Sequence, residues 1–419
     1  MTNSKYVPKR RFKEFELDGE WEQLKLGDHA NILTGGTPNT SISSYWEPKE
    51  IPWMSSGEVN RRRLDKTDNM ISNDGIRNSS ARWVKKHSIL IALAGQGKTR
   101  GMVAVNNIPL TTNQSVAAIE PDKTLNYEFV FQNLSKRYDE LRLISSGDGS
   151  RGGLNKQIVS DISIACPNVN EQELIGNFLA DFDSLITMNQ HKLDKLKDLK
   201  KAYLTEMFPA EGERVPKRRF PGFEGEWEQK RLATIASMHA RIGWQNLRTS
   251  EFLNDGDYYL ITGTDFLDGR INFDNCYYVD KERYQQDKNI QVKTGSILIT
   301  KDGTIGKVAI VGHLDKPATL NAGVFNVVIK ESNVDEKYLY QYLASPFLMD
   351  YVSKRVTGGT IKHLNQGILV DFPINIPTYE EQKAIGKFFE HLDQSITLQQ
   401  QKLDKLNNLK KAYLNELFV

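Results

Sequence analysis

The chain has 419 residues, of which 26% are charged and 39% hydrophobic, and its formal net charge is +2. This length supports two or three domains, and the near-neutral charge means that any contact with nucleic acid must come from local basic clusters. No apolar run is long enough to cross a bilayer and the start "MTNSKYVPKR" is no signal peptide, so a cytoplasmic protein is expected. The two cysteines, Cys166 and Cys276, lie far apart, which predicts neither a disulfide framework nor a thiolate metal site.

The N-terminal segment is the first of several parts that occur twice. "VPKRRFKEFELDGEWEQ", starting at Val7, returns as "VPKRRFPGFEGEWEQ" from Val215, with a two-residue gap between the matched blocks. Glycine and proline among aromatic residues predict an extended linker that places its Phe and Trp under a domain. The second copy therefore starts near Arg214.

Each linker is followed by a part of mixed character whose two copies have diverged. Apolar runs predict short strands at Ser88–Leu93, Met102–Val105, Ser115–Ile119, Tyr258–Ile261, Ser296–Ile299, Lys307–Val311 and Gly323–Ile329. Helices are predicted at Tyr127–Arg142 and at Glu336–Ser353, the latter broken by Pro346. Each part closes with a matched segment, "GLNKQ" and "HLNQG", and with Pro167 or Pro377.

A long amphipathic helix is predicted after each closing segment. Glu171–Phe208 recurs as Glu381–Phe418, with about 22 of 38 positions identical, and the predicted caps are Asn168 or Asn170 and Thr378. Apolar residues repeat every three or four positions, which is a heptad pattern once Asn189, Lys200, Gln399 and Lys410 are allowed as polar fillers. The seam residues are Ile175, Leu179, Phe182, Ile186, Leu193, Leu196, Tyr203 and Met207, and then Ile385, Phe389, Leu392, Ile396, Leu403, Leu406, Tyr413 and Leu417.

The two helices are expected to pair with each other as an antiparallel coiled coil with pseudo-two-fold symmetry. Each would be about 57 Å long at 1.5 Å per residue, with a globular part at either end. The alternative is a helical hairpin inside an ordinary core. The predicted fold class is α+β, divided as 1–167 (linker and first domain), 168–210 (first helix), 211–377 (linker and second domain) and 378–419 (second helix).

No catalytic constellation emerges from the sequence. Gly95–Gly101 ("GQGKTRG") resembles a phosphate loop but fails its spacing, because Ala92 occupies the position that requires glycine. Asp181, Asp183 and Asp194 are interpreted as solvated charges on a helix. The histidines show no ligand spacing, so no metal site is predicted. These absences favour a binding protein over an enzyme.

Polar, glycine-containing stretches at equivalent places in both halves are the candidate DNA-binding loops. Glycine lets backbones approach closely, Arg and Lys reach phosphates or guanine, and Asn and Gln pair with adenine. The alternative is ordinary solvated turns. The candidates in the first half are Gly35, Gly36, Thr37, Arg61, Arg62, Lys98, Thr99, Arg100, Asn113, Gln114, Ser150 and Arg151; those in the second are Arg241, Trp244, Gln245, Lys301, Thr304, Asn321, Thr360, Lys362 and His363.

Three repeated motifs together resemble a known family. They are "LTGGTP…YW…IPW" in Leu33–Trp53, the "LNK"/"LNQ" segments, and the two "KLDKL…LKKAYL" helices. This pattern resembles the specificity subunit of bacterial type I restriction-modification systems. The second half has "RIGWQN" where the first has "GGTP".

The resemblance implies a non-catalytic subunit with two target-recognition domains. Each domain would read one half of a split double-stranded DNA target, and the helical pair would set the gap between the halves. Two methyltransferase (M) subunits and restriction (R) subunits would be its partners. S-adenosylmethionine, ATP and Mg would be bound by those partners, with no cofactor on this chain. The runner-up hypothesis is a protein–protein adaptor without sequence-specific DNA binding; a third is an enzyme with a hidden site.

Overall fold

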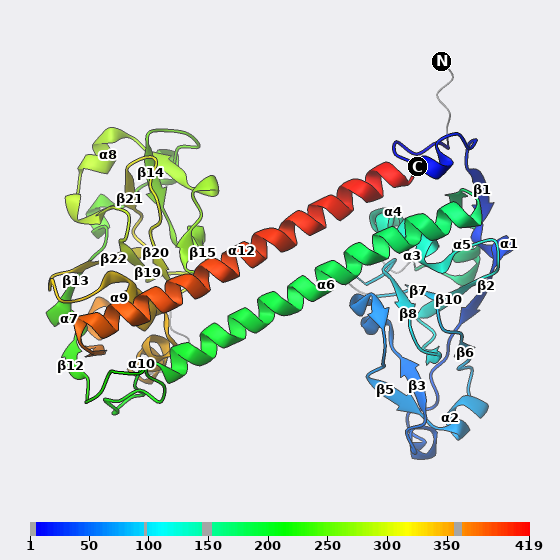
Figure 1. The fold of residues 1–419 in the computed structure, drawn as a ribbon, viewed down its shortest axis with the longest axis horizontal. Helices are drawn as coiled ribbons and strands as arrows, with labels where there is room; N and C mark the ends of the chain where they lie inside the picture. The colour runs from blue at the N-terminus through cyan, green and yellow to red at the C-terminus, as the bar shows by residue number, and fades with distance from the viewer. Residues whose placement is uncertain (1–5, 96–98, 145–152, 356–362) are drawn as a thin grey trace. The chain divides into compact units, whose positions relative to one another are not determined.

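The computed structural model describes the chain except for residues 1–5, 96–98, 145–152 and 356–362 (Figure 1). It divides into two compact units: unit 1 is Met1–Gln190 with Gln401–Val419, and unit 2 is His191–Gln400. Each long helix therefore contributes one part to each unit. Within the described residues, no helix is long and apolar enough to span a membrane.

Unit 1 contains two mixed sheets with short helices around them. The first sheet has the order β2 (Ala30–Thr34), β10 (Val116–Pro121), β7 (Ile89–Ala92), β8 (Val103–Asn106) and β4 (Arg63–Leu64). The second has the order β5 (Asn69–Ile71), β3 (Ile51–Met54), β9 (Leu110–Thr112) and β6 (Trp83–Val84). The helices are α1 (Leu26–His29), α2 (Asn73–Arg77), α3 (Tyr127–Lys136), α4 (Tyr138–Leu143) and α5 (Lys156–Ser160). The single helix predicted over Tyr127–Arg142 is therefore two helices that meet at Arg137, whose guanidinium donates to the Ser163 carbonyl.

Unit 2 repeats this plan with one added hairpin strand. Its larger sheet has the order β13 (Ala236–His239), β22 (Val324–Ile329), β19 (Ile297–Thr300), β20 (Val308–Ile310), β16 (Arg270–Ile271) and β15 (Phe266–Leu267). The smaller has the order β17 (Tyr277–Val279), β14 (Tyr258–Ile261), β21 (Ala318–Leu320) and β18 (Gln291–Val292). The helices are α7 (Leu232–Ile235), α8 (Lys281–Gln285), α9 (Glu336–Ala344), α10 (Pro346–Arg355) and α11 (Gln366–Val370), with α10 starting at the predicted break.

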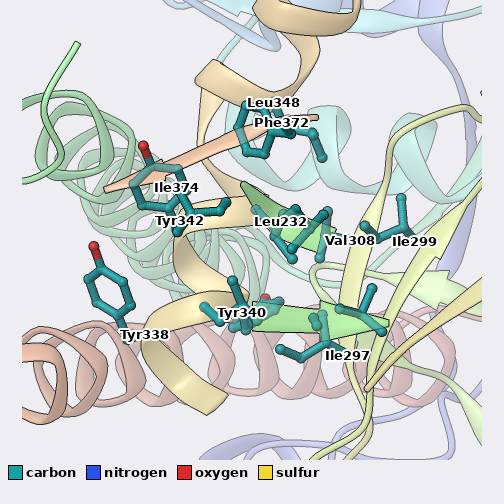
Figure 2. Close-up of a cluster of buried hydrophobic side chains, with 14 of the residues drawn as sticks. Leu232, Ile297, Ile299, Val308, Tyr338, Tyr340, Tyr342, Leu348, Phe372 and Ile374 are labelled. Atoms are coloured by element: carbon teal, nitrogen blue, oxygen red, sulfur yellow. The ribbon is translucent and has the colours of Figure 1, made fainter. Parts of the chain in front are cut away.

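The core of unit 2 lies between the larger sheet and the helices packed on it. Tyr340 projects from the side of α9 that faces Ile297 of β19, whereas Tyr338 and Tyr342 project from the opposite side of the helix (Figure 2). Burial of Tyr340, which is 4% exposed, favours the docking of α9 on the sheet. In unit 1 the equivalent core places Ile89 and Ile91 of β7 with Phe129, Phe131 and Leu134 of α3. The two copies thus keep the same layers with different side chains.

Each linker ends in a strand that the sequence analysis missed. β1 (Glu22–Lys25) pairs antiparallel with β11 (Ser163–Cys166), and β12 (Glu228–Arg231) pairs in the same way with β23 (Pro373–Ile376). The tryptophan before each strand, Trp21 or Trp227, is buried, as expected. Charged residues hide the strand pattern of β1 and β12, because most of their side chains are exposed.

The long helices are α6 (Val169–Glu206) and α12 (Tyr379–Leu417), and they pack together as predicted. In unit 1, Tyr413 packs edge-on against Phe178 at 5.0 Å between ring centroids, and in unit 2 Tyr203 packs the same way against Phe388 at 5.0 Å. In unit 1, Asp183 follows Phe178 on α6 and pairs with Lys410, which precedes Tyr413 on α12; in unit 2, Lys200 precedes Tyr203 and pairs with Asp393, which follows Phe388. The pairing is therefore antiparallel in each unit. Asn168 caps α6 by accepting from the Glu171 amide at 3.0 Å.

The predicted seam residues are buried or half-buried. The buried members are Ile175, Leu179, Leu193, Met207, Ile385, Phe389, Leu392, Leu403 and Leu417, and the half-buried members are Phe182, Ile186, Leu196, Tyr203, Ile396, Leu406 and Tyr413. The polar fillers Asn189, Gln399 and Lys410 are buried as well.

One interpretation of the helix surface is wrong. Asp183 is not a solvated charge, because its side chain is only 14% exposed and forms ion pairs with Lys410 and Arg63. Asp181 and Asp194 are exposed.

Candidate nucleic-acid interface

Three chain segments meet at one edge of the larger sheet in unit 1. The Leu93 amide donates to the Ser115 carbonyl at 2.8 Å, and the Leu154 amide donates to the Leu93 carbonyl at 2.9 Å. These bonds bring together the residues after β7, the turn before β10 and the "GLNK" segment. Unit 2 repeats both bonds: the Lys301 amide donates to Gly323 and the Leu364 amide donates to Lys301, each at 2.8 Å. The recurring polar stretches are therefore assembled into one loop edge per unit.

The "GGTP" stretch joins this edge in unit 1. The Gly36 amide donates to the Thr112 carbonyl at 2.8 Å, and Thr37 donates its hydroxyl proton to the Gln114 side chain at 2.6 Å. A Cβ at Gly35 would collide with Thr112, and one at Gly36 would collide with the Ser80 backbone. Both glycines therefore serve the packing of the loop. Thr37 is half-buried and Gln114 is exposed, so the polar pair borders solvent.

The other described candidates of unit 1 differ in solvent exposure and in the hydrogen bonds that they form within the protein. Thr99 and Arg100 are half-buried, and Arg100 donates to the Arg142 carbonyl at 2.9 Å. The Asn113 side chain accepts from the Ser115 amide at 3.1 Å and so shapes the turn that presents Gln114.

Arg61 and Arg62 are held by the protein itself. Arg61 pairs with Glu58 and Asp68, whereas Arg62 lies over the Phe131 ring at 5.2 Å and donates to Ser135. These contacts direct Arg62 toward α3 rather than toward the loop edge.

In unit 2 the edge carries Lys301, Thr304, Asn321 and His363. His363 is 78% exposed and its Nδ1 lies 2.6 Å from an Asp302 carboxylate oxygen. Thr304 is exposed, and the Lys301 ammonium lies 5.7 Å from the centroid of the Phe325 ring. Asn321 accepts from the Ala322 amide at 2.8 Å and occupies the place that Asn113 has in unit 1. His363 and Thr304 thus face solvent at this edge, whereas Lys301 is half-buried.

Arg241 and Gln245 are placed differently from their predicted role. The Arg241 side chain is buried and donates to the Leu320 carbonyl at 3.0 Å, and further to Gln286 and Thr319. Burial, together with the nearby Arg283, lowers the pKa of Arg241. Gln245 is buried too. A buried guanidinium cannot reach a phosphate without leaving its partners, so these two residues support the loop from within. Trp244 lies between them in a short 3-10 helix, Gly243–Gln245.

Five candidates lie outside the described residues. They are Lys98, Ser150, Arg151, Thr360 and Lys362.

An exposed aromatic residue on the edge strand of the smaller sheet in unit 1 was not among the predicted site residues. Trp83 is 50% exposed in β6, opposite Thr111 of β9, and its neighbours Arg82, Lys85 and Lys86 are exposed. An aromatic side chain among basic ones is the composition that stacks on bases and contacts phosphates. The run "RWVKK" was a visible signal. Gln291 occupies the equivalent position of β18 in unit 2.

Both linkers also clasp the long helices in a way that the sequence analysis missed. Arg11 donates two hydrogen bonds of 2.7 Å to the buried Glu171 of α6, and Arg219 does the same to the buried Glu381 of α12 at 2.7 and 2.8 Å. The preceding arginine of each linker forms an ion pair with the other long helix. Arg10 pairs with Glu416 of α12 at 2.5 Å, and Arg218 pairs with Glu206 of α6 at 2.6 Å. The repeated "RRF" and "EQ" motifs were the signal for these clasps.

Among the described residues, no group of three His, Cys, Asp or Glu side chains could hold a metal ion.

A family model described as "Type I restriction modification DNA specificity domain" matches residues 18–198 and again 224–408. The type I restriction enzyme MjaVIII specificity subunit of Methanocaldococcus jannaschii is 22% identical over 98% of this chain and 96% of its own length. The EcoR124I/EcoR124II specificity subunit of Escherichia coli is 28% identical over 40% of this chain and 42% of its own. The crystal structure of a type I restriction-modification S subunit from M. genitalium matches with a TM-score of 0.64 and 15% identity, covering 99% of both chains.

Proposed function

Since the chain belongs to the family of type I restriction-modification DNA specificity subunits, we propose that each of its units reads one half of a split DNA target. As a DNA specificity subunit it is a non-catalytic member of its complex. The reading groups are proposed to be exposed or half-buried polar side chains of the two loop edges. In unit 1 these are Thr37, Arg100 and Gln114, and in unit 2 they are Lys301, Thr304 and His363.

The repeated loop edge is the observation that carries this proposal. The same two backbone hydrogen bonds hold it in both units, while its side chains differ: Gln114 stands where unit 2 has Ala322, and Leu93 where it has Lys301. A constant frame with variable polar groups suits two readers of different base sequences. Two copies of one catalytic site would need the same side chains twice.

The partners are proposed to dock on surfaces that are copied rather than diverged. Unit 1 exposes Met188 of α6 and Leu409 of α12, and unit 2 exposes the equivalent Leu398 and Leu199. Equivalent exposed apolar positions beside equivalent clasps offer two similar surfaces, which suits two copies of one methyltransferase subunit. One solved relative, with a TM-score of 0.52 and 15% identity, comes from work on complex assembly and conformational transition of the type I R-M system.

The chemistry of the complex is proposed to belong to its other subunits. S-adenosylmethionine would be bound by the M subunits, and ATP and Mg by the R subunits. Because the substrate is cellular DNA, the bacterial cytoplasm is the proposed location.

The test is methylome sequencing of cells that express this chain with its methyltransferase. We expect one split motif in which methylated adenines occur in both half-sites. Exchanging the Thr34–Thr40 and Thr111–Ser115 segments for those of a relative should change one half-site only. Methylation without a split motif would contradict the proposal, and sequence-independent DNA binding of the purified complex would favour the adaptor alternative.

A further inference from the structure

Asp183 joins three elements of unit 1. Its Oδ1 accepts from the ammonium of Lys410 on α12 at 2.5 Å. Its Oδ2 accepts from the Gln132 side chain of α3 at 2.7 Å and from Arg63 of β4 at 3.1 Å. One carboxylate on α6 therefore holds both the opposite long helix and the globular part.

Asp393 repeats this junction in unit 2. Its Oδ1 lies 2.6 Å from the Lys200 ammonium of α6, and its Oδ2 accepts from the Gln341 side chain of α9 at 2.8 Å. The same oxygen serves the same kind of partner in both units. The arginine contact differs between the units. Arg63 of β4 pairs with Asp183 in unit 1, whereas Arg270, at the equivalent position of β16 in unit 2, is exposed. The parts common to both copies are the Asp–Lys pair between helices and the Gln arm to the globular part.

Polar junctions fix geometry in a way that the surrounding apolar contacts cannot. Leu, Ile and Phe side chains of a helix seam tolerate small rotations, since apolar contact has no preferred direction. A one-residue slip of either helix would turn the carboxylate by about 100° and leave a largely buried Lys unpaired. Buried ionic groups in helical pairs are best known for specifying register rather than for adding stability.

We propose that Asp183 and Asp393 are positioning residues that lock the orientation of each globular part on its helix segments, and thereby the spacing between the half-sites that the complex accepts. This inference rests on the proposed function. Neither carboxylate touches DNA in this assignment. Each acts through Gln132 or Gln341 on the helix that the sheet and the loop edge are packed against.

The test uses the full complex with its methyltransferase and a DNA library in which the two half-sites are separated by every spacing from zero to about ten base pairs, one helical turn. The variants are Asp183→Asn and Asp393→Asn, with the exposed Asp181→Asn and Asp198→Asn as matched controls on α6. We expect the half-site sequences to stay unchanged, while methylation at spacings one base pair away from that of the wild-type complex rises about tenfold relative to the correct spacing. The controls should behave like the wild-type complex.

Two further variants separate positioning from folding. Gln132→Met and Gln341→Met keep the Asp–Lys pairs and remove the Gln contact to the globular part. Gln341→Met should relax the spacing by a similar factor, and Gln132→Met should relax it less, because Arg63 of β4 still binds Asp183. Reversing the pair with Asp393→Lys and Lys200→Asp should restore the original spacing, since Gln341 can accept from an ammonium through its Oε1. Unchanged spacing preference in folded Gln132→Met and Gln341→Met complexes would overturn the inference. Absence of any split target for the wild-type complex would instead reject the proposed function.

Discussion

The buried carboxylates Glu171 and Glu381 show how single residues tie the linkers to the long helices. Each accepts both hydrogen bonds of a bidentate arginine and has no exposed side-chain surface. A bidentate guanidinium pair is directional, and a carboxylate without its partner in such a place is costly. The clasps therefore position the linker strands β1 and β12 as well as the helix ends.

Replacing Arg11 by Met should destabilise unit 1 by about 3 kcal/mol, because Glu171 keeps its buried charge and loses its partner. The measurement is urea unfolding of the full chain. Arg10→Met is the matched control: its side chain is 57% exposed, and loss of such a surface pair should cost less than about 1 kcal/mol. If both variants lower the free energy of unfolding equally, the buried ion pair at Glu171 stabilises the chain no more than a surface pair.

Asp183 gives a prediction for pH. Burial acts to raise the pKa of Asp183, but the attraction and hydrogen bond of Lys410, with Arg62 and Gln132, lower it overall. A carboxyl group whose folded pKa is depressed contributes stability above its unfolded pKa of about 4, and this contribution is lost as pH falls through the folded value. Arg63 faces the same carboxylate, and Glu128 pairs with Arg63.

Asp183→Asn should accordingly destabilise the chain by about 3 kcal/mol at pH 7, and the difference from the unchanged protein should shrink below about pH 4. Thermal unfolding at a series of pH values measures this. Asp181→Asn, on the same helix but exposed, should show no such dependence. A difference that stays constant down to about pH 3, below the unfolded pKa, would mean that the charge of Asp183 does not stabilise the fold.

At the scale of elements, the long helices were predictable and the small sheets only partly so. Heptad spacing is a local property that survives in the sequence, so the seam followed from it. The antiparallel pairing followed instead from the duplication, with the two halves related by a two-fold axis. Strands such as Ile89–Ala92 were visible as buried apolar runs. β1 and β12 were not, because their partners lie more than a hundred residues away and most of their side chains face solvent. The same holds for Asp183, which looks like any surface acid until Lys410 is placed opposite it.

Gly176 of α6 and Gly386 of α12 occupy equivalent positions, where α3 and α9 pack closely against the long helices. A Cβ at Gly176 would lie 2.9 Å from the Phe129 amide nitrogen, and one at Gly386 would lie 2.9 Å from an Asp335 side-chain oxygen. Alanine favours an isolated helix over glycine by about 1 kcal/mol. Here the contact atoms are backbone and a capping side chain, which cannot move away without breaking the cap of α3 or α9.

Gly176→Ala should therefore give a net destabilisation of about 1–2 kcal/mol, in spite of its better helix propensity. Asn177→Ala, at the adjacent exposed position, should be neutral or stabilising. Denaturant unfolding of both variants measures the contrast. A more stable Gly176→Ala chain would show that helix propensity outweighs the close approach of α3.

At the scale of the whole molecule, the duplication distinguishes the contacts that both units have from the side chains that differ between them. The linker clasps, the Asp–Lys junctions and the backbone bonds of the loop edge recur in both units, so they serve tasks that the units have in common. Apart from the equivalent Asn113 and Asn321, the candidate reading side chains of the loop edges do not recur. The loop edges could be located from the recurrence of polar stretches, but Arg241 and Gln245 could not be told from surface residues, because burial depends on how β13 meets β21 and α8.

If each unit recognises its half-site independently of the other, substitutions in the two units should have additive effects. Gln114→Ala in unit 1 and Thr304→Ala in unit 2 should each weaken discrimination at a single half-site, by about 1–3 kcal/mol for a lost base contact. The two residues belong to different units and share no partner among the described contacts, so the effects in the double variant should add within about 0.5 kcal/mol. Methylation rates on targets with one altered base pair per half-site measure both terms. A large departure from additivity would mean that one unit senses how well the other is bound, and the complex would then require a coupled rather than an independent reading of its two half-sites.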